Sequence, residues 1–163
     1  MTNKKLKQTA VRFGKISMLV IIASIITLAV NAQSKYSIGD KGPGGGWIFY
    51  AENGGFMEVS VSLGEHTYNN AVSVARNYRG GGFSDWRLPD KEELNMIYVN
   101  LRKGRKVKIA GIAAKWHWSS TSYSCASPDG CVWVQHLGSG DQFDYVKFPT
   151  LKIFVLAVRA FTP

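Results

Sequence analysis

The sequence contains few of the residues that build metal centres. It has two cysteines and three histidines among 163 residues. His66, His117 and His136 show no ligand spacing such as His-Glu-x-x-His, and Cys125 and Cys131 lack the second Cys/His pair that structural zinc needs. The sequence therefore predicts neither a metal site nor a cofactor.

Motifs for catalysis and nucleotide binding are also missing. No serine lies in a nucleophile-elbow motif, and no two carboxylates have a spacing that indicates glycosidase chemistry. The glycine-rich stretch at 39–46 leads into an apolar strand pattern, whereas a phosphate-binding loop leads through Gly-Lys-Ser/Thr into a helix. Its glycines therefore indicate a tight turn, and no residue of the sequence is predicted to be catalytic.

Proline is scarce, and no repeat or linker divides the chain. Five prolines stand against 17 glycines, and 45% of the residues are hydrophobic. This composition is too apolar for a disordered chain and indicates many turns between short elements. Residues 33–163 have the length of one domain with a single core.

Acidic residues are absent from the first 32 residues, which carry five basic ones. An uncharged apolar run follows at 18–30, shorter than the roughly 20 residues needed to cross a bilayer, and residues 30–32 offer a small-residue cleavage site. This pattern predicts a signal peptide at 1–32 and export to the periplasm, the outer surface or the medium. Membrane contact is then expected only through an uncleaved leader.

The two cysteines flank a short turn in the exported part. Between Cys125 and Cys131 lies Ala-Ser-Pro-Asp-Gly, a strong turn signal that returns the chain on itself. In an oxidising compartment this arrangement favours a disulfide that closes the tip of a hairpin.

The rest of the chain shows short helices and strands. Thr67 precedes a predicted helix over 68–78 that glycines 80–82 end, and Asp90 with Glu93 forms a capping box that starts a second helix. Strands are predicted at 47–51, 57–63, 116–121, 131–137, 142–148 and 153–161. Two helices with a mostly antiparallel sheet and long loops make the predicted fold class α+β.

Several blocks of the chain resemble a known bacterial domain. Residues 81–94, which include the Trp-Arg-Leu-Pro block, and residues 118–121, 133–140 and 158–159 resemble the domain that ends the Legionella collagen-like adhesin. The resemblance implies a C-type-lectin-like fold and binding of sulfated or otherwise anionic polysaccharide at a cell surface. Within the block, Trp86 is expected to be buried, and Asp85 and Arg87 to satisfy each other or nearby backbone groups.

The formylglycine-generating enzymes share a similar Arg-Leu-Pro block, which keeps a second function open. That reading requires the two cysteines to bind copper as thiolates, and their turn setting favours a disulfide instead. The Glu-Pro-Asn and Gln-Pro-Asp triplets of calcium-dependent sugar-binding lectins are missing. A structural cell-surface subunit, with a homo-oligomer as one form, is a third alternative.

A basic segment after the second helix is the strongest functional signal. Residues 102–108 contain no acidic residue and five cations, namely Arg102, Lys103, Arg105, Lys106 and Lys108. Because the whole chain has a net charge of +9, the leader and this segment together account for all of the excess. Such a cluster fits a polyanion, although a solvated loop beside a helix C-terminus explains it as well.

The expected ligand of this segment is an anionic glycan such as a glycosaminoglycan, lipopolysaccharide or capsule. Nucleic acid is not expected, because no series of aromatic residues for base stacking accompanies the cations. Trp116 is a second candidate, since its ring could stack on a sugar, although a tryptophan in a short strand is more often a core residue.

Overall fold

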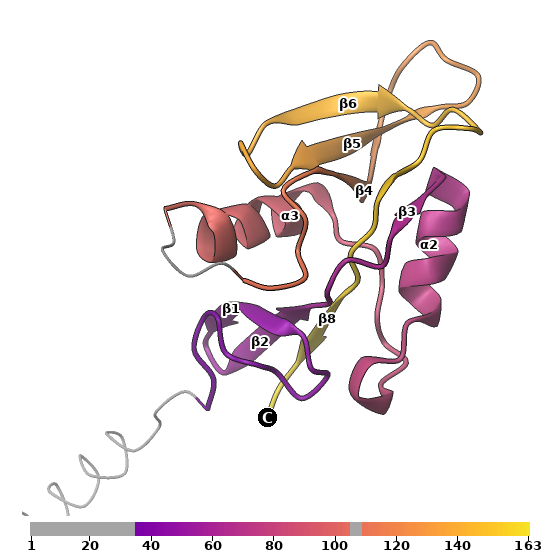
Figure 1. The fold of residues 1–163 in the computed structure, drawn as a ribbon. Helices are drawn as coiled ribbons and strands as arrows, with labels where there is room; N and C mark the ends of the chain where they lie inside the picture. Colours follow the sequence, from indigo (N-terminus) through magenta and orange to yellow (C-terminus); the bar gives the residue numbers. More distant parts are fainter. Residues whose placement is uncertain (1–34, 105–108) are drawn as a thin grey trace, which may run out of the picture. The chain divides into compact units, whose positions relative to one another are not determined.

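The computed structural model describes residues 35–104 and 109–163. The predicted signal peptide lies outside these residues, and so do Arg105, Lys106 and Lys108 of the basic segment. Within the described part, two α-helices and eight strands confirm the α+β class (Figure 1). No helix in this part is long and apolar enough to cross a membrane.

The smaller sheet joins the two ends of the described chain. Its order is β1 (Trp47–Glu52), β2 (Gly55–Val59) and β8 (Val158–Phe161), with antiparallel pairing throughout. Asn53 and Gly54 connect β1 to β2 with φ of 51° and 76°. Positive φ at both loop residues is typical of the Asn-Gly turn that matches the twist of a two-residue hairpin.

The larger sheet carries the strands of the second half of the chain. Its order is β3 (Glu65–His66), β7 (Ile153–Phe154), β4 (Trp116–Tyr123), β5 (Cys131–His136) and β6 (Gln142–Val146). The pairing is antiparallel except between β4 and β7. The predicted hairpin through residues 138–141 is confirmed, because β5 and β6 pair directly.

The two helices cover opposite faces of this sheet. Tyr68 in α2 (Tyr68–Asn77) packs edge-on against Trp118, whereas Asn95 in α3 (Lys91–Ile97) accepts a hydrogen bond from Gln135. Trp118 pairs with Val134, the neighbour of Gln135, and successive side chains of a strand point to opposite faces. A layer of side chains therefore fills each side of the sheet.

Both predicted helices are present, and the capping box is confirmed. Asp90 accepts a hydrogen bond from the Glu93 amide at 2.7 Å, and the Glu93 carboxylate accepts one from the Asp90 amide at 2.8 Å. The chain then continues as a π-helical turn at Tyr98–Arg102. Leu94, Ile97 and Leu101 form one buried stripe, as the sequence pattern predicts.

The prediction of one last strand at 153–161 is wrong in one respect. This part of the chain forms two strands, which belong to different sheets. β7 belongs to the larger sheet and β8 to the smaller, and the buried residues 155–157 cross between them. Similarly, the predicted strand 57–63 ends at Val59. There the Ser60 amide donates to the Ala157 carbonyl oxygen at 2.8 Å, while the Ala157 amide donates to the Ser60 hydroxyl at 2.9 Å, so a side chain takes over one of the two backbone bonds of the pair.

A buried ion pair ties the smaller sheet to the glycine-rich loop. Glu58 in β2 is fully buried and accepts hydrogen bonds from Arg159 at 2.7 Å, from the Gly44 amide at 2.9 Å and from the Gly46 amide at 3.0 Å. A Cβ at Gly44 would lie 2.6 Å from the Glu58 carboxylate. Glycine is therefore required in the GPGGG loop because its backbone approaches this carboxylate too closely to leave room for a side chain.

The Trp-Arg-Leu-Pro block joins the same network. Trp86 is buried as predicted. Asp85 accepts a hydrogen bond from Arg159 at 2.7 Å, and Arg87 forms its ion pair with Glu93, so Asp85 and Arg87 are not each other's partners. The hydrogen bond from Arg159 holds the pKa of the Asp85 carboxyl below its usual range.

The ion pair predicts a large effect of one neutral substitution. Glu58→Gln removes the buried one of the two carboxylates that pair with Arg159 and leaves the half-exposed Asp85 as its remaining countercharge, so we expect the free energy of unfolding to fall by about 3 kcal/mol. The measurement is urea unfolding at pH 7. Glu52→Gln, the same change at an exposed position of the same hairpin, should alter stability by less than about 0.5 kcal/mol. Equal effects of the two variants would contradict the assignment.

Candidate functional site

Of the basic segment, the structure describes Arg102 and Lys103. Arg102 is partly buried, and its guanidinium donates hydrogen bonds to the carbonyl oxygens of Leu137 at 3.0 Å and Ile112 at 2.9 Å. Arg105, Lys106 and Lys108 lie outside the described residues. Of the two described cations, Lys103 is exposed to solvent, whereas Arg102 connects two neighbouring loops through its hydrogen bonds.

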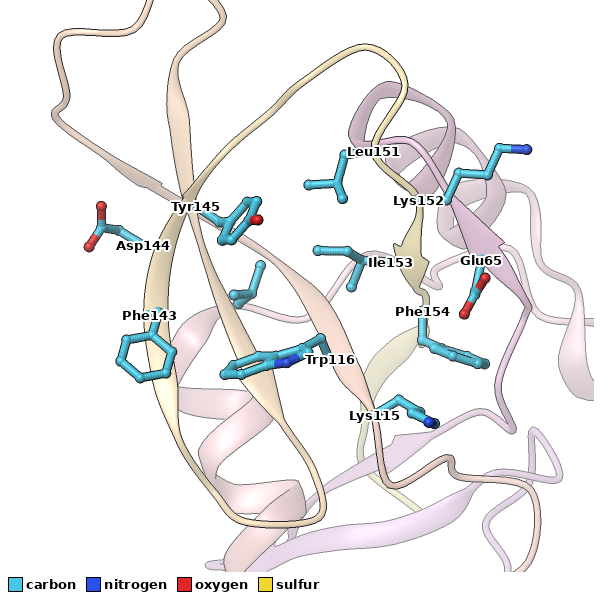
Figure 2. A pocket seen from close by; sticks show the side chains of 11 residues that line it. Glu65, Lys115, Trp116, Phe143, Asp144, Tyr145, Leu151, Lys152, Ile153 and Phe154 are labelled. Carbon is cyan, nitrogen blue, oxygen red and sulfur yellow. The ribbon is translucent and has the colours of Figure 1, made fainter.

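Trp116 lies in a cleft on the larger sheet. The cleft has a volume of about 530 Å³ and lies on the face of β4, β5 and β6 that also carries Trp118. Figure 2 shows Trp116, Phe143 and Tyr145 on one side of it and Leu151 and Ile153 on the other. Among Arg102, Lys103 and Trp116, the predicted ligand residues that the structure describes, Trp116 is the one that lines this cleft.

The strand register explains why these aromatic residues meet. Phe143 lies opposite Val134 and Tyr145 opposite Val132, while Trp116 lies opposite His136. Because side chains alternate between faces, every second residue of β6 points to the same side as Trp116. The Trp116 and Phe143 ring centroids are 5.5 Å apart.

The aromatic surface is open to solvent. Phe143 is 56% exposed and Tyr145 is 45% exposed, and Trp116 is partly buried against the His136 ring at 5.2 Å. Large aromatic side chains are normally covered, so a group of them in a cleft indicates a surface for binding.

Charged side chains of both signs surround the aromatic residues. Lys115 and Lys152 line the cleft, and so do Glu65 and Asp144. In Figure 2 the Asp144 carboxylate points away from the Tyr145 ring, toward the outside of β6. The lining of the cleft therefore contains two lysines and two acidic residues, and in Figure 2 the Lys152 ammonium group is directed away from the Trp116 ring.

Phe143, Tyr145, Leu151 and Ile153 are site residues that the sequence analysis did not find. Residues 142–148 alternate between polar and apolar side chains, which is typical of a strand with one face in the core. Nothing in that alternation shows that the apolar face lies at the end of a sheet without a covering layer. The pairing of β6 as the last strand decides this.

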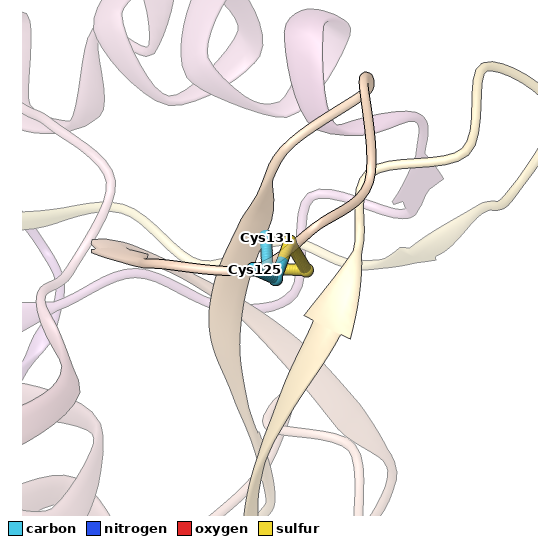
Figure 3. Close-up of a disulfide and its surroundings, with 2 residues drawn as sticks. All are labelled: Cys125 and Cys131. Carbon is cyan, nitrogen blue, oxygen red and sulfur yellow. A yellow bond between two sulfur atoms is a disulfide. The ribbon is translucent and has the colours of Figure 1, made fainter.

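The predicted disulfide between Cys125 and Cys131 is confirmed (Figure 3). It joins the segment after β4 to the first residue of β5, with the two Cα atoms 5.9 Å apart. Both cysteines of the chain are used in this bond, and a disulfide offers no thiolate to a copper ion. Among the described residues, no three His, Cys, Asp or Glu side chains are placed to hold a metal ion.

The sequence matches no protein-family model and no curated protein.

His117, next to Trp116, points to the opposite face and is fully buried. Its Nδ1 lies 2.8 Å from the Lys115 carbonyl oxygen. A carbonyl oxygen only accepts, so Nδ1 carries the proton of the neutral ring. Nε2 has no hydrogen-bond partner within residues 35–104 and 109–163. Burial lowers the pKa of His117 to about 4, and the charge of nearby Arg102 acts in the same direction.

Because the pKa of His117 is lowered in the folded chain, we expect the free energy of unfolding to decrease in acid. Below pH 6.5 the unfolded chain binds a proton at His117 that the folded chain does not, so the free energy of unfolding falls until the pH reaches about 4. The loss attributable to His117 is about 3 kcal/mol. It is measured by urea unfolding at several pH values between 7 and 4.

His117→Gln removes the titrating group, so the difference in unfolding free energy between wild type and this variant should change with pH over that interval. Parallel curves for wild type and His117→Gln would show that His117 does not titrate differently in the two states.

Proposed function

We propose that this chain is an exported polysaccharide-binding module with a C-type-lectin-like fold, and that it recognises an anionic glycan as an adhesin or an envelope component. The observation that carries the proposal is the open aromatic cleft formed by Trp116, Phe143 and Tyr145. The sequence resemblance to the collagen-like adhesin domain, the confirmed α+β class and the disulfide support it.

The shape and chemistry of the cleft suit a sugar. A flat aromatic ring offers apolar surface to the C–H face of a pyranose while the sugar hydroxyls stay in water, and it loses little entropy because it has few rotatable bonds. The volume of about 530 Å³ lies within the range of roughly 300–1,000 Å³ of small-molecule sites, which is room for one or two sugar rings of a longer chain.

The preference for an anionic glycan rests on the cations near the aromatic rings. Lys115 directly precedes Trp116, and Lys152 lies between Leu151 and Ile153 in the opposite wall. Ammonium groups bind sulfate or carboxylate as mobile point charges. The basic segment at 102–108 is the second source of positive charge, with Lys103 as its exposed described residue.

The aromatic cleft is tested with two aromatic residues of β4, the partly buried Trp116 and the exposed Tyr123. Trp116→Ala removes a ring from the cleft, whereas Tyr123→Ala removes an exposed ring that packs on Trp133, on the other face of the sheet. We expect Trp116→Ala to weaken binding to an immobilised acidic polysaccharide such as heparin at least fivefold, or about 1 kcal/mol. Tyr123→Ala should bind like wild type.

An equal loss in the two variants, with unchanged unfolding curves, would move the site away from the cleft. Absence of binding to heparin, lipopolysaccharide and capsular polysaccharide alike by the wild type would overturn the proposed function itself.

The source of the charge preference is tested separately. Lys115→Ala with Lys152→Ala should lower the salt concentration that elutes the protein from heparin, because cations at the cleft contact the acidic groups directly. The matched variant replaces Lys103, Arg105, Lys106 and Lys108 by Ala and keeps Arg102, whose guanidinium fastens two loops. Elution that shifts in the second variant alone would assign the anion preference to the basic segment.

A further inference from the structure

The strand β6 ends the larger sheet, and among the described residues no strand pairs with its outer edge. The amide of His136 donates to the Asp141 carbonyl, and the amide of Lys147 donates to the Gly130 carbonyl. In an antiparallel pair the residues alternate between those that bond to the neighbour and those that point away. The backbone groups of residues 142, 144 and 146 therefore point outward from the sheet.

This edge is unusually apolar. Six large hydrophobic side chains are exposed in the described chain, and three of them, Phe143, Tyr145 and Phe148, lie within six residues on and just after β6. In most proteins, a proline, a bulge or several charges keep an unpaired edge strand from pairing with another chain. β6 pairs with β5 without a register shift and carries one charge, at Asp144.

We propose that two copies of this chain pair through β6 as antiparallel strands around a twofold axis at Tyr145. In this register Tyr145 lies opposite its own copy, Asp144 lies opposite Val146, and Phe143 lies opposite Lys147. Residues 144 and 146 are both outward-bonding, so the register satisfies the hydrogen-bond alternation.

The charges of the strand favour this register over the neighbouring ones. Moving the axis to Asp144 would place two carboxylates opposite each other, which is destabilising. Moving it to Phe143 would shift the pairing into the turn at residues 138–141 and away from Phe148. In the proposed register Lys147 meets an aromatic ring, and an ammonium group near a ring face is attracted to it.

The pairing has a consequence for the cleft, which rests on the proposed function. Strands that extend an antiparallel sheet keep the same face on the same side, so the two Tyr145 rings would lie side by side across the junction, with Phe143 of each copy diagonally across from Tyr145 of the other. The two aromatic clefts would then form one longer groove, which fits a polymer better than a single sugar. A dimer with two such sites also gains apparent affinity for a repeating ligand.

The test uses the chain expressed with its own leader, in the processed form that the cell yields. Light scattering during size-exclusion chromatography should give the mass of two chains at micromolar concentration. Phe143→Lys places a second cation opposite Lys147 and should raise the dimer dissociation constant at least tenfold relative to Phe143→Glu. Both variants lose the same ring at the same exposed position, so their difference reports the residue across the junction.

A cysteine pair tests the register directly. Tyr145→Cys should form a disulfide-linked dimer on a non-reducing gel, because opposite residues that do not bond through their backbones have Cα atoms about 4.5 Å apart, within reach of a disulfide. Asp144→Cys, one residue along, should not link to its own copy.

A wild type that stays monomeric at 100 µM would overturn the dimer. Linkage through residue 144 but not 145, or equal dissociation constants for Phe143→Lys and Phe143→Glu, would overturn the register. Because mass and cross-linking are measured without polysaccharide, these outcomes do not depend on the proposed function. A dimer that binds no glycan would refute that function alone.

Discussion

The ion pair between Glu58 and Arg159 joins two strands of the smaller sheet across 101 residues of sequence. Glu58 lies in β2 and Arg159 in β8, and the same carboxylate accepts hydrogen bonds from the glycine-rich loop before β1. Arg159 also reaches Asp85, beside the buried Trp86. Two buried charges are costly to desolvate, so this arrangement is stable only because each has several partners. Their geometry therefore constrains the glycine-rich loop, strands β2 and β8 and the Trp-Arg-Leu-Pro block together.

The crossing from β7 to β8 follows from this constraint. Arg159 must reach Glu58 in the smaller sheet, while Ile153 and Phe154 remain paired in the larger one. The residues between them are fully buried and connect the two sheets through the core. As a result, Leu151 and Ile153 stand beside the larger sheet as the wall that faces Trp116, and the cleft is a consequence of how the chain changes sheets.

The position of β6 gives the larger sheet two different ends. Trp118, on the same face as Trp116, is covered by Tyr68 of α2. Farther toward β6 the same face carries Phe143 and Tyr145, which remain largely open. One side of this sheet is thus part of the core where α2 covers it and is exposed to solvent at Phe143 and Tyr145. Both the proposed sugar site and the proposed dimer use that uncovered part.

Local features of this chain were readable from the sequence. The capping box at Asp90 and Glu93 depends on side chains three residues apart, and the disulfide between Cys125 and Cys131 closes a turn that its own residues favour. The helices and most strands were predicted for the same reason, since periodicity and turn residues act over a few neighbours. Arg102 shows the limit. Its carbonyl partners at Ile112 and Leu137 belong to other loops, so composition alone presents it as a free cation.

The sequence by itself determined the α+β class, the helix starts, the short disulfide and the presence of apolar strands. Only the tertiary structure decided that the last predicted strand divides between two sheets, that Asp85 and Arg87 have different ion-pair partners, and that Phe143 and Tyr145 join Trp116. The physical reason is that an alternating strand pattern states which residues share a face but not what covers that face. Coverage depends on strand order and on helices encoded elsewhere in the chain, which meet the strand only in the folded protein.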